Sequence, residues 1–166
     1  PLARQAVGLA TRRRGRQTPG SPAAVLLWSG NTLANSVVNR NLPGIRQQLE
    51  QNGISLNQSQ WAAWEASLSR RLQTVWGPPG TGKSRTLRAV AIGAVVDAVQ
   101  RNVPLRILIC APTYNALDNV LLETVTAIGQ IVQHPDLLSV RIRSIFRPAD
   151  PNIPNTLDLE LDKFHP

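Results

Sequence analysis

The sequence has one cysteine, two histidines and no methionine. Cys110 alone cannot form an internal disulfide, and with histidines only at His134 and His165 we expect no zinc-binding cluster. Cys110 lies in an apolar run, so we expect it to be a small buried residue. The longest apolar stretch, residues 89–96, is far shorter than the ~18 residues that cross a bilayer, and no cleavable signal pattern is present. These features favour an intracellular protein, cytoplasmic or nuclear, with no membrane partner.

Methionine is also missing from the first position, where Pro1 stands, so we expect the chain to be a piece of a longer protein. The formal net charge is +8, but the first 20 residues carry five arginines and no acid, so the remainder is only mildly basic. We predict that residues 1–22 are a basic disordered linker. A nuclear-import signal or a phosphate-binding arm remains open for the run from Arg12 to Arg16.

The strongest motif is a glycine-rich loop with the pattern G-x-x-x-x-G-K-[ST], which predicts triphosphate binding. Its glycines allow φ > 0 and let the backbone amides approach a phosphate chain. Lys83 can reach the β and γ phosphates, and the Ser84 hydroxyl can bind Mg²⁺. The predicted nucleotide-binding residues are Gly77, Pro78, Pro79, Gly80, Thr81, Gly82, Lys83, Ser84 and the adjoining Arg85. Of these, Lys83 and Ser84 are also the candidate catalytic residues.

The elements around the loop match what such a motif needs. Residues 72–76 predict a short strand before it, and residues 84–100 predict a helix after it. An earlier helix, near 57–70, begins with a predicted capping box between Asn57 and Gln60. Its recurring apolar residues Trp61, Trp64 and Leu68 are expected to face the core, rather than to stack on a base.

Further along, residues 106–111 predict a second strand and 140–143 a third. Between them lies an amphipathic helix whose apolar positions are Leu117, Leu121, Val125, Ile128 and Val132. This order predicts an α/β fold with a parallel sheet and right-handed crossovers. Ligands bind at the carboxyl ends of such strands, where Gly77 and Pro112 both lie.

The loop alone fits several classes of nucleotide-binding protein. GTPases are disfavoured, because no Asn-Lys-x-Asp motif occurs and the only lysines are Lys83 and Lys163. Three further blocks are informative: L-N-Q-S-Q at residues 56–60, I-L-I-C-A-P-T-Y-N-A-L-D-N-V at 107–120, and S-V-R-I-R-S at 139–144. With the loop, these resemble superfamily 1 helicases of the up-frameshift-like group over residues 54–146.

This resemblance implies a RecA-like P-loop NTPase fold: a parallel sheet with helices on both faces, incomplete because the chain is a fragment. It also implies a division of the chain. Residues 23–55 would be an upstream element of unknown type, 56–146 the start of the first motor domain, and 147–166 the start of an insertion subdomain.

The resemblance further implies that Gln60 reads the adenine edge, which makes ATP with Mg²⁺ the expected cofactor. A carboxamide suits this role because it donates and accepts hydrogen bonds together. The alternative is that Gln60 only closes the capping box with Asn57, and both interpretations remain open.

The segment after the second predicted β-strand corresponds to the family's first motif that contacts single-stranded nucleic acid. Pro112, Thr113 and Asn115 are therefore candidates to bind the phosphates of single-stranded DNA or RNA. Tyr114 departs from the family pattern, and a tyrosine there is able to stack on a base. Thr113 and Asn115 serving simply as helix caps is an equally open interpretation.

No Asp-Glu pair follows an apolar strand, although a helicase needs one to hold Mg²⁺ and to position the attacking water. Residues 157–162 alternate acidic with apolar residues and do not form such a pair. We thus expect a helicase or translocase in the longer protein, with this piece inactive alone. An AAA+ ATPase and a truncated, non-catalytic binding module are the alternatives.

Overall fold

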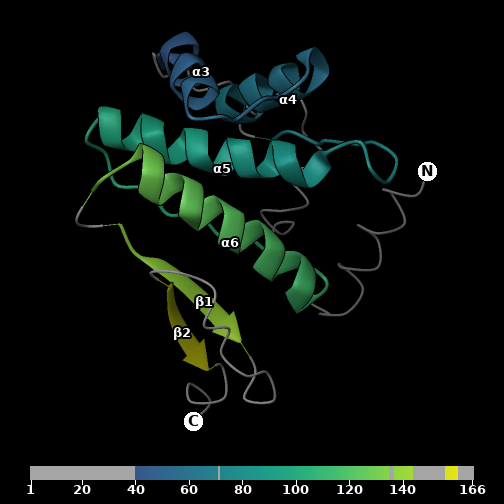
Figure 1. Cartoon of the computed structure of the whole chain (residues 1–166), viewed down its shortest axis with the longest axis vertical. Coiled ribbons are helices and arrows are strands. Elements are labelled where there is room, and N and C mark those ends of the chain that lie inside the picture. Colours follow the sequence, from purple (N-terminus) through teal and green to yellow (C-terminus); the bar gives the residue numbers. More distant parts are fainter. Residues whose placement is uncertain (1–39, 71, 135–136, 144–155, 161–166) are drawn as a thin grey trace, which may run out of the picture.

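A computed structural model describes residues 40–70, 72–134, 137–143 and 156–160 (Figure 1). The predicted linker at 1–22, the part of the upstream element before residue 40 and most of the predicted insertion at 147–166 lie outside the described residues. Helices make up most of the described part, together with a small parallel sheet. The α/β class is confirmed, with a smaller sheet than the sequence predicts.

Helix α3 (Leu42–Gln51) was not predicted, because its region was assigned only to an unknown upstream element. The side chain of Asn41 accepts a 3.1 Å hydrogen bond from the Gly44 amide, and a proline lies in the first turn. Asparagine before the first turn and proline within it are standard signals of a helix start. Ile45 and Leu49 lie one turn apart and are fully buried, so α3 is part of the core.

Helix α4 (Gln58–Ser69) confirms the predicted helix and its capping box. Asn57 Oδ1 accepts from the Gln60 amide at 2.9 Å, and Gln60 Oε1 accepts from the Asn57 amide at 3.0 Å. Trp61, Trp64 and Leu68 are buried, which confirms the core interpretation. The two indole rings meet edge to face with centroids 5.2 Å apart, an arrangement that aromatic pairs prefer.

Helix α5 (Lys83–Gln100) follows the glycine-rich loop, as predicted. Figure 1 shows α3 and α4 on one side of α5, and α6 (Tyr114–Ile131) on the other. A buried cluster fills the space between these helices. Its members are Ile45, Leu49, Trp61, Trp64, Leu68, Ala89, Ile92, Val96, Ile128 and Val132.

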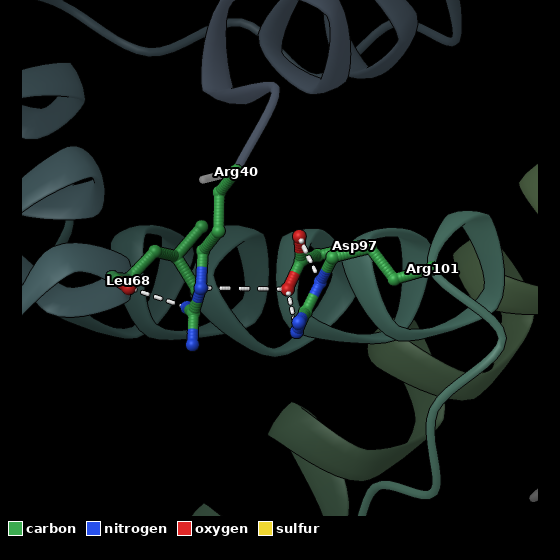
Figure 2. Close-up of polar contacts among 4 residues, drawn as sticks. All are labelled: Arg40, Leu68, Asp97 and Arg101. Atoms are coloured by element: carbon green, nitrogen blue, oxygen red, sulfur yellow. Dashed lines mark hydrogen bonds and ion pairs between the residues drawn. The ribbon is translucent and has the colours of Figure 1, made fainter. Parts of the chain in front are cut away.

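A charged cluster ties three helices together (Figure 2). The buried carboxylate of Asp97 on α5 accepts two hydrogen bonds from Arg101, at 3.0 and 2.7 Å. It also pairs with Arg40, whose Nε lies 3.5 Å away. Arg40 in turn donates to the carbonyl of Leu68 near the end of α4. Arg40, two residues before the start of α3, thereby contacts both α4 and α5.

The sheet consists of β1 (Ser139–Arg143) and β2 (Thr156–Glu160), which pair in parallel with Ser139 opposite Thr156. The strand predicted at 140–143 is confirmed. Strand β2 was not predicted, although the alternation of leucine with acidic residues there is the pattern of a half-buried strand.

Two other strand predictions were wrong: residues 72–76 and 106–111 are not assigned to any strand. Both segments lie without strand partners among the described residues, and their apolar side chains are correspondingly uncovered. Trp76 is 91% exposed and Leu108 is 82% exposed. Cys110 is exposed as well, so its predicted burial was wrong. An apolar run becomes a buried strand only where neighbouring strands and helices cover it.

Candidate functional site

The glycine-rich loop adopts the backbone that the sequence predicts. Gly80 and Gly82 have φ of +80° and +82°, a region that residues with a side chain rarely adopt. A β-carbon at Gly82 would also stand 2.4 Å from Gln60 Nε2, and one at Gly77 would stand 2.7 Å from Thr81 Oγ1. The loop therefore requires glycine at Gly82 for its conformation, and a β-carbon there would also displace the Gln60 carboxamide.

Lys83, the first residue of α5, folds back over the loop. Its ammonium group donates to the carbonyls of Gly77 and Pro78, at 2.6 and 2.7 Å. The hydroxyl of Thr81 donates to the same Pro78 carbonyl at 2.8 Å. The lysine charge is thus held directly above the turn that leads into α5.

The N-terminus of α5 has no side-chain cap. Gly82 occupies the capping position and offers no side chain to the amides of the first turn. Those amides and the positive end of the helix dipole favour a negatively charged ligand. Ser84 and Arg85 are exposed in the same turn. An exposed hydroxyl beside the lysine suits Ser84 to bind the Mg²⁺ that accompanies a triphosphate.

Gln60 connects helix α4 to this loop. While its Oε1 closes the capping box, its Nε2 donates a 3.0 Å hydrogen bond to the carbonyl of Thr81. The sequence interpretation treated capping and nucleotide contact as competing roles for Gln60. In the structure the two ends of the carboxamide are used separately, so capping and contact with the loop coexist. Adenine reading stays a prediction.

The second candidate site lies at the start of α6. Thr113 Oγ1 accepts a 3.3 Å hydrogen bond from the Ala116 amide, so the predicted capping role of Thr113 is confirmed. Pro112 and Asn115 are exposed, and Tyr114 is half-buried. Figure 1 shows α5 and α6 running in the same direction, so that both helices begin on the same side of the molecule. A role of these residues in nucleic-acid binding stays a prediction.

An ion pair that the sequence analysis missed joins these two helices. Arg88, in the second turn of α5, pairs with Glu123 of α6. Burial, and secondarily the positive charge of Arg85, lowers the pKa of Arg88 below its usual value. The pair connects the helix that follows the loop with the helix that follows Thr113.

The described residues hold neither a metal-binding cluster nor a helix that could cross a membrane. Residues 40–70, 72–134, 137–143 and 156–160 hold no group of three or more histidine, cysteine, aspartate and glutamate side chains arranged for a metal ion. None of the helices in this part of the chain combines the length and the apolar character that crossing a bilayer requires.

Comparison with known proteins identifies the family. Residues 55–160, well over half of the chain, match a family model described as an AAA domain. The chain belongs to this AAA domain family. The match includes the glycine-rich loop, α4 to α6 and both strands, which makes the fold that of an α/β P-loop NTPase. Helix α3 lies just before the matched residues, yet it packs into the same core.

Curated relatives of this AAA domain are helicases. It is 32% identical over 118 residues to the fission yeast (Schizosaccharomyces pombe) "Helicase required for RNAi-mediated heterochromatin assembly 1", a match that covers 65% of the chain and 12% of that protein. It is 34% identical over 105 residues to the budding yeast (Saccharomyces cerevisiae) "DNA polymerase alpha-associated DNA helicase A", covering 63% of the chain and 14% of that protein. No solved structure matches significantly.

These matches confirm the resemblance to superfamily 1 helicases. The AAA domain is therefore a helicase-like nucleotide-binding domain, and the chain spans about an eighth of the length of these relatives.

Proposed function

We propose that the chain is the ATP-binding part of a nucleic-acid helicase or translocase. The family match and the helicase names of two relatives support this proposal at the level of the class. The observation that carries it is the loop geometry, in which two left-handed glycines precede Lys83 at the uncapped start of α5.

Each loop residue has a part in ATP binding. The amides of the loop and of the first turn of α5 donate to the phosphate oxygens. Lys83 exchanges its two carbonyl partners for the β and γ phosphates, which stabilises the charge that the triphosphate brings. The Ser84 hydroxyl would hold Mg²⁺, which would supply positive charge to neutralise the phosphates.

The second part of the proposal is a contact with single-stranded DNA or RNA at the start of α6. Thr113 already offers its hydroxyl oxygen to the Ala116 amide, and a hydroxyl of this kind still has a proton to donate to a phosphate. Pro112 and Asn115 are exposed beside it. Such contacts hold the strand in place without reading its sequence.

We infer that this chain by itself binds ATP without hydrolysing it. Residues 157–162 do not provide the Asp-Glu pair that positions the attacking water. Hydrolysis in the full-length protein would then depend on residues that this chain does not supply.

The test of the proposal is Lys83→Ala in the full-length protein. We expect loss of strand-stimulated ATP hydrolysis, with binding of a single-stranded oligonucleotide retained, because Lys83 faces the loop and not α6. Arg106→Ala is a matched control, since it also removes one positive charge, from an exposed side chain in the segment before α6. Unchanged hydrolysis by the Lys83 variant, or no heat on mixing ATP and Mg²⁺ with the wild-type protein, would overturn the proposal.

A further inference from the structure

A buried ion pair joins α6, whose first turn carries the proposed nucleic-acid contacts, to strand β1 of the sheet. Arg141, in the middle of β1, donates through Nε to Asp118 Oδ1 at 2.7 Å and through Nη2 to Asp118 Oδ2 at 2.8 Å. Arg141 is 2% exposed and Asp118 is 7% exposed. The two residues are 23 positions apart in the sequence and belong to separate motif blocks.

A pair of this kind determines geometry more than stability. Removing two charges from water costs free energy that their attraction only partly offsets, so buried pairs are weak contributors to net stability. Two parallel hydrogen bonds between a planar guanidinium and a carboxylate, however, allow only a narrow range of relative positions. The pair therefore restricts how far the start of α6 can rotate or shift relative to β1.

Asp118 lies close to the residues of α6 that are proposed to contact nucleic acid. Asp118 lies three residues after Asn115, which places the two on neighbouring positions of the helix surface. Thr113, the capping residue, lies about one turn before Asp118. The first turn of α6, which carries the proposed strand contacts, is thus held through Asp118.

We propose that Arg141 is a positioning residue for nucleic-acid binding. By holding Asp118 through two hydrogen bonds, Arg141 keeps Thr113 and Asn115 in a fixed position relative to the sheet, where they can contact single-stranded nucleic acid. This inference rests on the proposed function, because it assigns Arg141 a role in the strand contact at the start of α6. Arg141 does not touch the strand itself.

The test compares two lysine substitutions in the full-length protein. Arg141→Lys keeps the charge but removes the bidentate geometry. Arg101→Lys is the matched control, because Arg101 makes the same two-bond contact with buried Asp97 at the far end of α5. The measurements are the affinities for a labelled single-stranded oligonucleotide and for ATP, at a temperature well below unfolding.

We expect Arg141→Lys to weaken strand affinity roughly tenfold and to leave ATP affinity unchanged. Arg101→Lys should change neither affinity. Asp118→Asn provides a second test from the other side of the pair, and it should weaken strand affinity in the same way because a neutral amide cannot hold the guanidinium as firmly.

Three results would overturn the inference. If wild type binds the strand and both variants of the pair bind it equally well, Arg141 has no positioning role while the proposed function stands. If Arg101→Lys weakens strand affinity as much as Arg141→Lys does, the effect is one of general stability. If wild type binds no single strand, the proposed strand contact fails, and the inference fails with it.

Discussion

The side-chain amide of Gln60 donates a 3.0 Å hydrogen bond to the main-chain carbonyl of Thr81, within the glycine-rich loop. The other end of the same carboxamide closes the capping box of α4. One residue therefore links the start of α4 to the loop that precedes α5. Because the oxygen of the Gln60 side chain caps α4 and its nitrogen contacts the loop, a substitution that changes only one of these atoms can separate the two roles.

Gln60→Glu separates them. Glutamate still closes a capping box, but it cannot donate to the Thr81 carbonyl and places a second acceptor against it. We expect a small loss of stability, because the carboxylate repels the Thr81 carbonyl, and an ATP affinity about tenfold lower, measured by calorimetry.

Gln58→Glu is the control, because it adds the same negative charge at the first residue of α4, where the side chain is exposed. Wild-type ATP affinity in the Gln60 variant would limit Gln60 to a capping role. An equal loss in both variants would indicate a general effect of charge.

Close packing between α4 and α5 leads to a stability prediction. Trp64 Nε1 donates a 2.9 Å hydrogen bond to the Ala89 carbonyl, and a β-carbon at Gly93 would stand only 2.8 Å from that nitrogen. The ring is buried and held by its hydrogen bond, so it has little freedom to move. We expect Gly93→Ala to destabilise the chain by about 1 to 3 kcal/mol in urea unfolding.

Gly129→Ala is the matched control for this substitution. Gly129 lies in α6, and apart from the adjoining helix backbone no atom of the described residues stands within 4 Å of its β-carbon position. Alanine there should stabilise the chain by up to about 1 kcal/mol, through its higher helix propensity. If Gly93→Ala is also stabilising, Trp64 is able to shift, and the contact between α4 and α5 is looser than its geometry indicates.

The cluster around Asp97 gives a third prediction. Replacing this buried carboxylate by alanine leaves Arg40 and Arg101 without their shared partner (Figure 2). The side chains of Arg40 and Arg101 are 26% and 32% exposed, so water can solvate them once the carboxylate is gone. We therefore expect Asp97→Ala to cost about 1.5 to 3 kcal/mol, the contribution of a hydrogen bond to a charged group. The measurement is the midpoint of urea unfolding.

Glu50→Ala is the comparison, since Glu50 pairs with Arg46 on the exposed surface of α3 at 2.9 Å. Pairs of this kind are worth about 0.5 kcal/mol or less. Similar losses in the two variants would mean that Asp97 is not effectively shielded from solvent, and that Arg40 does not anchor the region before α3.

The structural features that the sequence predicts correctly depend on residues that are close together in the sequence. The capping box of Asn57 and Gln60, the positive φ of Gly80 and Gly82, and the apolar face of α4 all follow from local spacing, and all are confirmed. Helix α3 carried similar local signals, in the capping residue Asn41 and the apolar pair one turn apart, but its region was assigned only to an upstream element of unknown type.

The parts that sequence predicts poorly depend on distant partners. Burial of Cys110 and strand formation at 72–76 were inferred from apolar runs, yet each needs neighbouring strands to cover it, which local composition does not report. The pairing of Asp118 with Arg141 joins positions 23 apart, and nothing in either motif indicates the other. The same holds for the contact from Gln60 to Thr81.

The last prediction separates the two roles of Thr113, which caps α6 and is proposed to bind a strand phosphate. Aspartate is as good a capping residue as threonine, but its negative charge repels phosphates. We expect Thr113→Asp to retain stability and to lose about tenfold or more in affinity for a single-stranded oligonucleotide, with a smaller dependence on salt. Asn57→Asp, which changes the capping residue of α4 in the same way, should leave strand affinity unaltered. Equal strand affinity of the Thr113 variant and the wild type would exclude this residue from the interface, and would leave capping as its whole role.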